Sequence, residues 1–219
     1  MLNKKYLSQQ NAIASYSSVD VLDGVGYINF YPCAFKLSGS TTYGVAQSTG
    51  LASGKVVQKI VGATPTPTTI NYDLVFNKPQ SIKGKLLLSY SLGIGIGNGG
   101  AGTQVFTIAK IYKVSSATTQ LGATITNAAL ITNAGDKSMT AMNSFDLSDQ
   151  VYIFKAGDIL RVQIYLAGGG GSTTTYGYGQ DPAATADAAD AAASPAELQC
   201  ITSGYTTRMT IAVPFILDL

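Results

Sequence analysis

Residues 151–166 read VYIFKAGDILRVQIYL, and this stretch decides the fold class. Its middle, residues 155–158, is rich in turn-forming residues. Over residues 160–166, apolar residues at every second position alternate with Arg161, Gln163 and Tyr165. An alternation with a period of two is typical of a β-strand that buries one face. The stretch therefore predicts two strands joined by a tight turn, the second of which packs its apolar face into a core.

Similar strand patterns occur elsewhere in the chain. Apolar residues alternate with polar ones over residues 70–77 and 82–92, whereas residues 103–114 are apolar or β-branched on both faces. Pro65 and Pro67 exclude a helix before the first of these strands. A length of 219 residues is within the range of one large all-β domain. The sequence therefore predicts an all-β fold, a single antiparallel β-sandwich.

Two segments differ from this pattern in composition. Residues 1–26 are polar and weakly patterned, so we expect an extended N-terminal arm before a β domain over residues 27–219. Residues 167–200 are rich in glycine and alanine, which predicts a long low-complexity loop that folding does not require. Tyr176 and Tyr178 lie in this loop and are candidate recognition residues, because tyrosine offers broad amphipathic contact. A surface loop without a binding role is the alternative.

The residue types that enzymes use most are scarce. The chain has no histidine and no tryptophan, and Glu197 is the single glutamate among 12 acidic residues. Without histidine, the usual general base and the commonest metal ligand are missing. Cys33 and Cys200 are far apart in sequence and give no disulfide framework and no metal-ligand spacing. We therefore predict no catalytic residues, no cofactor and no metal site, and we expect a protein that is not an enzyme.

The surface is short of charge. Charged residues make up 12% of the chain, about half the ~25% usual for soluble domains. Such a surface suits extensive contact with other proteins, although a stable β-sandwich that works alone is the alternative. The net charge of +2 argues against nucleic acid or a membrane as a partner. No signal-peptide core and no apolar stretch of membrane-spanning length is visible, so we expect a protein made in the cytoplasm.

Residues 103–114 require a cover for their second apolar face. One side of this strand packs on the core, and a neighbouring subunit would cover the other side. A polar arm that cannot build a core of its own is expected to become ordered on a partner surface. The candidate protein-interface residues are Phe106, Ile108, Ile111 and Tyr112 on the strand and Tyr6 and Tyr16 in the arm.

The C-terminal half of the chain carries a family resemblance. VYIFKAGDILRVQIYL, followed by a loop and by YTTRMTIAVPF at residues 205–215, resembles the last strands of jelly-roll domains of the tumour-necrosis-factor/C1q type. In that pattern an aromatic-apolar pair precedes a Gly-Asp turn and an alternating strand. The arm that leads through ASYSSVDVLDGVGYINFY at residues 14–31 is similar to structural proteins of tailed phages.

The resemblance implies a jelly-roll β-sandwich and a non-enzymatic virion structural protein, because jelly rolls of this kind recur in capsid, decoration and head-fibre proteins. It implies a capsid decoration (cement) protein or a minor capsid protein that forms a homotrimer and binds the major capsid protein. The expected location is the virion, assembled in the host cytoplasm. The alternative is a head-fibre or tail module that binds a host surface glycan or receptor through residues 167–200.

Overall fold

The structure, a computed structural model, describes residues 14–15, 24–38, 42–47, 56–62, 68–97, 103–128, 130–132, 135–169, 174–180 and 209–216. These residues form β-strands and short turns, and none of them is helical. The described part accordingly contains no helix that is long and apolar enough to cross a membrane. The predicted all-β class is confirmed.

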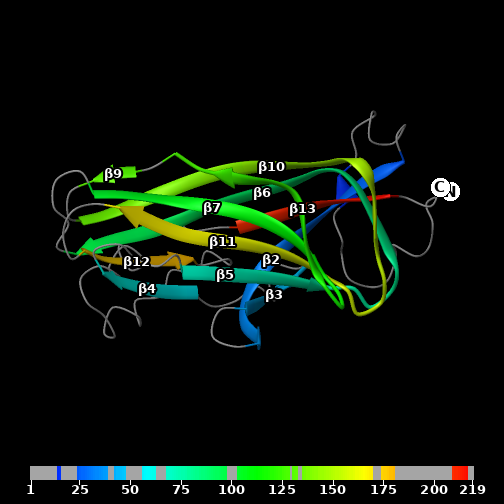
Figure 1. Cartoon of the computed structure of the whole chain (residues 1–219), viewed down its shortest axis with the longest axis horizontal. Coiled ribbons are helices and arrows are strands. Elements are labelled where there is room, and N and C mark those ends of the chain that lie inside the picture. The colour runs from blue at the N-terminus through cyan, green and yellow to red at the C-terminus, as the bar shows by residue number, and fades with distance from the viewer. Residues whose placement is uncertain are drawn as a thin grey trace.

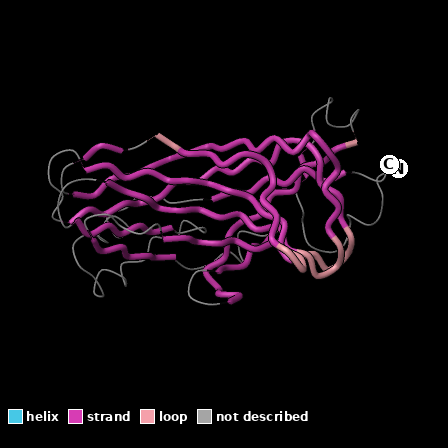
Figure 2. The backbone as a smooth tube through the Cα atoms, in the orientation of Figure 1, coloured by secondary structure: helices cyan, strands magenta, loops and turns pink. Residues whose placement is uncertain are grey.

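Most strands run along the long axis of the molecule (Figure 1), and most of the short turns gather at one end (Figure 2). The strands are β1 (Ala14–Ser15), β2 (Val25–Ser38), β3 (Thr42–Ala46), β4 (Val56–Gly62), β5 (Thr68–Val75), β6 (Gln80–Gly97), β7 (Thr103–Val114), β8 (Thr118–Thr126), β9 (Leu130–Thr132), β10 (Gly135–Phe154), β11 (Ile159–Gly169), β12 (Thr174–Gln180) and β13 (Met209–Ile216).

The strands pair in a nested order. β7 pairs with β8, β6 with β10, β5 with β11, and β2 with β13, and each of these pairs is antiparallel. These nested pairs mean that the chain from β2 to β13 folds back on itself between β7 and β8 as one long hairpin. β13 also pairs with β6, and β11 also pairs with β7, so the hairpin is rolled up. The result is two groups of neighbouring strands, β10-β6-β13-β2 and β3-β5-β11-β7-β8.

β2 connects the two groups. Its first half pairs with β13, and its second half pairs with β3. β3 then runs parallel to β5, with Thr42 opposite Asn71. The sheet is therefore mixed, and the prediction of a purely antiparallel fold is wrong at this position. A parallel pair needs a long connection, and residues 47–67, which include β4, supply it.

Both groups bury one face in a common core. In β11 the inward residues Leu160, Val162 and Ile164 are at most 2% exposed, as their alternation predicted. In β6, which belongs to the other group of strands, Leu86 and Leu88 are fully buried. The period-two pattern therefore identified the core faces of these strands correctly.

The segment predicted as a long loop is partly strand. β11 continues to Gly169, and residues 174–180 form β12, which pairs with β6 on one side and with β4 on the other. The loop assignment is therefore wrong for residues 174–180, and the prediction that folding does not require residues 167–200 stays a prediction. Residues 181–200 lie outside the described residues.

The arm is described only in part. β1 pairs with β2, with Ala14 opposite Ile28 and Ser15 opposite Tyr27. Tyr6 and Tyr16 lie outside the described residues, and so does Cys200. The division into an arm over residues 1–26 and a domain over residues 27–219 stays a prediction.

The turn after β10 is fixed by hydrogen bonds to the end of β5. The Gly157 amide donates to the Phe76 carbonyl at 2.7 Å, and the Phe76 amide donates to the Asp158 carbonyl at 3.0 Å. The Asp158 carboxylate accepts a hydrogen bond from the Lys155 amide at 2.9 Å. Gly157 has a φ of 89°, which disfavours any residue with a Cβ. The turn predicted from residues 155–158 is confirmed, and its backbone conformation favours glycine at position 157.

Candidate interaction face

The two faces of β7 have different surroundings. Thr107, Ala109 and Ile111 are fully buried in the core, whereas Ile108 and Tyr112 are partly exposed on the opposite face. The predicted interface residue Ile111 is therefore a core residue, because successive strand residues point to opposite faces. The interface prediction now concerns Phe106, Ile108 and Tyr112.

Strand register brings three residues of β11 beside these side chains. Tyr165 lies opposite Ile108, Gln163 opposite Lys110, and Arg161 opposite Tyr112. All of them are partly exposed. We call this surface the outer face, and it comprises Phe106, Ile108, Lys110, Tyr112, Arg161, Gln163 and Tyr165.

The tyrosines of the outer face contact each other and a lysine. The Lys110 Nζ lies 5.0 Å from the centre of the Tyr165 ring, within the range of a cation–π interaction. Burial, followed by the charge of Tyr165 and a side-chain hydrogen bond with Tyr165, raises the pKa of the Tyr112 hydroxyl. These contacts hold the aromatic rings in place before any partner binds.

An ion pair connects the outer face to β5. Arg161 donates from Nε and Nη2 to the two carboxylate oxygens of Asp73, both at 2.7 Å. Asp73 is only 4% exposed, so the carboxylate depends on Arg161 for compensation of its charge. The hydrogen bonds to Asp73 raise the pKa of the Arg161 guanidinium, against the opposing effect of its burial.

A chain of amides continues the polar network. The Gln163 Nε2 donates to the Asn71 Oδ1 at 2.9 Å, and the Asn71 Nδ2 donates to the Thr42 Oγ1 at 3.3 Å. The Gln163 Oε1 is buried, and among the residues that the structure describes it has no hydrogen-bond partner. Because this oxygen is buried, an incoming donor reaches it only if the Gln163 side chain moves.

The arrangement suits recognition of another surface. Tyrosine and arginine are enriched at protein interfaces, and side chains that are already fixed lose little entropy on binding. Asp73 neutralises Arg161, so Lys110 gives the outer face a slightly positive charge. The geometry therefore supports a contact surface whose side chains already contact one another.

Sequence reasoning found only part of this face. The alternation in residues 160–166 placed Arg161, Gln163 and Tyr165 together on one side of a strand, but it could not show that this strand lies beside β7. Tyr176 and Tyr178 lie in β12 and not in a loop, and their backbones pair with Ile60 and Gln58 of β4 and with Ile96 and Ile94 of β6. The prediction that a loop presents these tyrosines is therefore corrected.

A second polar cluster lies inside the core. The Tyr90 and Thr107 hydroxyls are 2.6 Å apart, and the Asn127 Nδ2 donates to the Tyr90 hydroxyl at 2.8 Å. The Asn143 side chain is also buried and lies beside Tyr90. Burial raises the pKa of Tyr90, although its neighbours Thr107 and Asn143 lower it in part. Burial also raises the pKa of Tyr72, with a smaller contribution from Tyr43.

These raised pKa values predict a loss of stability in alkali. Below pH ~10, both tyrosines are protonated in the folded and the unfolded chain, and the pKa shifts have no effect. Above pH ~10, these tyrosines lose their protons in the unfolded chain but keep them in the folded chain, because their pKa is raised there. The free energy of unfolding therefore falls as the pH rises. We expect the urea midpoint to fall between about pH 9 and about pH 11, and to fall less in Tyr90→Phe than in Tyr152→Phe. An equal fall in both variants would contradict this account.

Comparison with known proteins gives a structural likeness without a sequence relative. No family model and no curated protein sequence matches the chain. A CocE/NonD family hydrolase from Staphylococcus aureus is similar in structure, with a TM-score of 0.50 and 10% identity, over 92% of this chain and 39% of the hydrolase chain. The chain therefore spans about two fifths of the hydrolase's length.

Two further solved structures are less similar. The first is infectious bursal disease virus of the Gx strain, with a TM-score of 0.29 and 12% identity over 85% of this chain and 43% of the viral chain. The second is a CBM4 protein, with a TM-score of 0.26 and 14% identity over 81% of this chain and 79% of the CBM4 chain. The structural neighbours thus include a virus protein, but TM-scores this low carry no argument about function.

The prediction that the chain is not an enzyme is corrected by the first likeness. It rested on the missing histidine and on the scarcity of glutamate, yet the fold of nearly the whole chain is similar to part of a chain from a hydrolase family. Residue composition therefore does not separate this fold from hydrolases. At 10% identity the likeness shows the fold alone, and it assigns no reaction to this chain.

Proposed function

We propose that this chain is a jelly-roll structural protein of a virion that assembles with copies of itself through the outer face. The nested strand pairing supports the jelly-roll type, because a long hairpin rolled into two groups of strands is the defining topology of that fold. The low content of charged residues supports extensive contact with other proteins.

One observation carries the assembly proposal. Ile108, Tyr112 and Tyr165 are grouped on the outer face over a sheet whose polar residues are already hydrogen-bonded to each other. Such a group of large and partly exposed side chains is typical of the core of an interface. A second copy of the chain is the partner that we infer, in a homotrimer with closed symmetry.

In the virion, the trimer would act as a decoration or minor capsid protein. Many copies that each bind the shell weakly can stabilise it, because the contacts are multiplied by the symmetry of the particle. We infer that the N-terminal arm contributes to binding the major capsid protein. A host receptor or glycan stays the alternative partner, with Tyr176 and Tyr178 presented by β12 and not by a loop.

The assembly prediction is tested by mass in solution. Light scattering on the purified chain should give about three times the 22.7 kDa of one copy. Tyr112→Asp should reduce this mass to that of a monomer, because it replaces a large interface side chain by a small charged one that would have to be desolvated, while the β-type circular dichroism is kept. Ala156→Asp adds the same charge in an exposed turn and should leave the assembly intact. A wild-type monomer at high micromolar concentration would refute the homotrimer.

The virion location needs a separate experiment. Mass spectrometry of purified particles should find the chain in many copies beside the major capsid protein. Its absence from particles, together with a stable trimer in solution, would refute the virion role and leave the assembly proposal standing.

A further inference from the structure

A groove of about 370 Å³ opens between β2, the end of β5 and the start of β6. This volume is within the ~300–1,000 Å³ usual for sites that bind small molecules. The groove lies outside the outer face and shares no residue with it. Ligand binding in the groove is therefore independent of self-assembly through the outer face.

The floor of the groove is aromatic and already packed. Phe30, Phe76 and Phe215 line it, and each is at most 5% exposed. The ring centre of Phe215 lies 6.3 Å from that of Phe30 and 6.2 Å from that of Phe76. A preformed aromatic floor favours an apolar ligand group that adapts to it without moving the protein.

The rim of the groove is polar. Gln47, Asn77 and Gln80 provide amide groups, and Lys78 provides a positive charge. Lys78 is exposed, and among the described residues that line the groove it is the only charged one. An anionic group at the mouth would therefore meet a cation, and the described residues that line the groove include no carboxylate to repel it.

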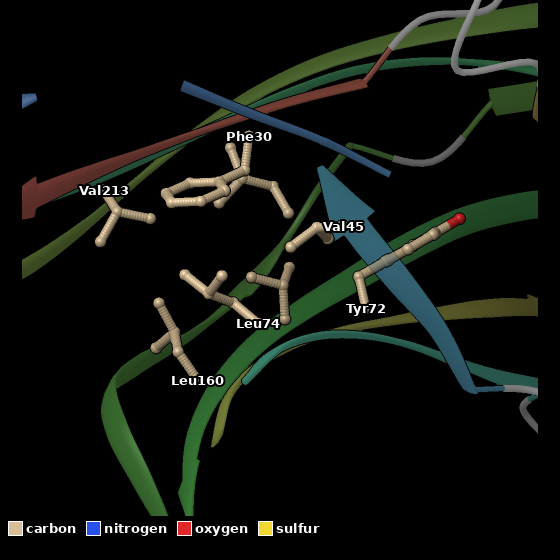
Figure 3. A pocket seen from close by; sticks show the side chains of 8 residues that line it. Phe30, Val45, Tyr72, Leu74, Leu160 and Val213 are labelled. Carbon is tan, nitrogen blue, oxygen red and sulfur yellow. The ribbon is translucent and has the colours of Figure 1, made fainter. Parts of the chain in front are cut away.

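An internal cavity lies behind the floor. It measures about 10 Å³, and Phe30 and Leu74 line both the cavity and the groove. Figure 3 shows Val45, Leu160 and Val213 around the same space, with the Tyr72 hydroxyl directed away from it. The cavity is at the lower limit for one water molecule and has an apolar lining, so it offers no good site for water. A shift of Phe30 or Leu74 would extend the groove into apolar space.

We propose that this groove binds a small amphipathic carboxylate. The apolar chain of the ligand lies on the three phenylalanines, and its end lies near Leu74. The carboxylate lies at the rim beside Lys78, where the amides of Gln47 and Asn77 offer hydrogen bonds. Apolar contact with the floor contributes to the affinity for any head group, and Lys78 supplies the preference for an anion over a neutral or cationic one.

Decanoate, decanol and decyltrimethylammonium test the proposal by calorimetry on the whole chain. We expect decanoate to bind about fivefold more tightly than decanol, because an exposed ion pair contributes up to about a factor of five. The decyltrimethylammonium cation should bind more weakly than decanol. Lys78→Gln should remove the advantage of decanoate and leave the affinity for decanol unchanged. Lys83→Gln removes another exposed lysine, which does not line the groove, and should behave as the wild type.

Methyl NMR locates the bound ligand. Decanoate should shift the methyl signals of Ile28, Leu74 and Val75, which line the groove, and leave the exposed Val151 and Ile153 unchanged. The proposal is overturned if decanoate does not bind at millimolar concentration, if Val151 and Ile153 shift instead, or if Lys78→Gln keeps the preference for decanoate. None of these outcomes depends on whether the chain forms a trimer.

Discussion

Arg161→Ala is expected to lower the free energy of unfolding by about 3 kcal/mol or more, because it leaves a buried carboxylate without its partner. Asp73 is 4% exposed and receives two hydrogen bonds of 2.7 Å from Arg161. Removal of the guanidinium takes away both of them, and water reaches the Asp73 carboxylate poorly. Urea unfolding with a shared m-value measures the loss.

The double variant Asp73→Asn with Arg161→Gln is the control for this prediction. It removes both charges and keeps polar side chains at both positions. We therefore expect the double variant to lose less of the free energy of unfolding than Arg161→Ala alone. If the double variant is as unstable as the single one, then packing and not charge compensation is the main contribution of Arg161. Light scattering on the same samples shows whether the loss of stability is accompanied by loss of assembly.

Phe154→Ala is expected to destabilise the fold by about 3–5 kcal/mol, the usual cost of removing a large core side chain. Phe154 is fully buried, and the centre of its ring lies 4.8 Å from that of Phe76. The Lys113 Nζ lies 5.3 Å from the centre of the same ring and forms an ion pair with Asp158 at 3.2 Å. The substitution therefore removes packing beside the turn that connects β10 to β11.

Ile153→Ala is the matched control. Ile153 is the preceding residue of the same strand and is 58% exposed. Its truncation should cost less than about 1 kcal/mol, since little buried area is lost. Similar losses for the two variants in urea unfolding would mean that β10 is not packed as the structure shows.

The sequence predicted the strands best where one face is buried and the other is polar. The alternation in residues 160–166 and the turn at residues 155–158 are local patterns, and the structure confirms both. Residues 103–114 were less informative, because apolar residues on both faces do not show which face is the core. Ile111 was therefore assigned to the interface, although it lies in the core.

Composition was misleading for residues 174–180. Glycine and threonine disfavour a confident strand assignment, and the segment became β12 only because β4 and β6 offer it hydrogen bonds on both edges. The sequence also did not predict the parallel pairing of β3 with β5, because residues 47–67 separate the two strands and no local pattern indicates which distant strands pair.

The sequence by itself determined the all-β class, the buried faces of the alternating strands and the tight turn before β11, because each of these depends on neighbouring residues and on the strand period of two. Only the tertiary structure decided which strands are neighbours. Register placed Asp73 opposite Arg161 and Tyr165 opposite Ile108, and the crossing of β2 between the two groups formed the groove beside Lys78. Pairing between distant segments depends on the packing of the whole core, and no local pattern contains that information.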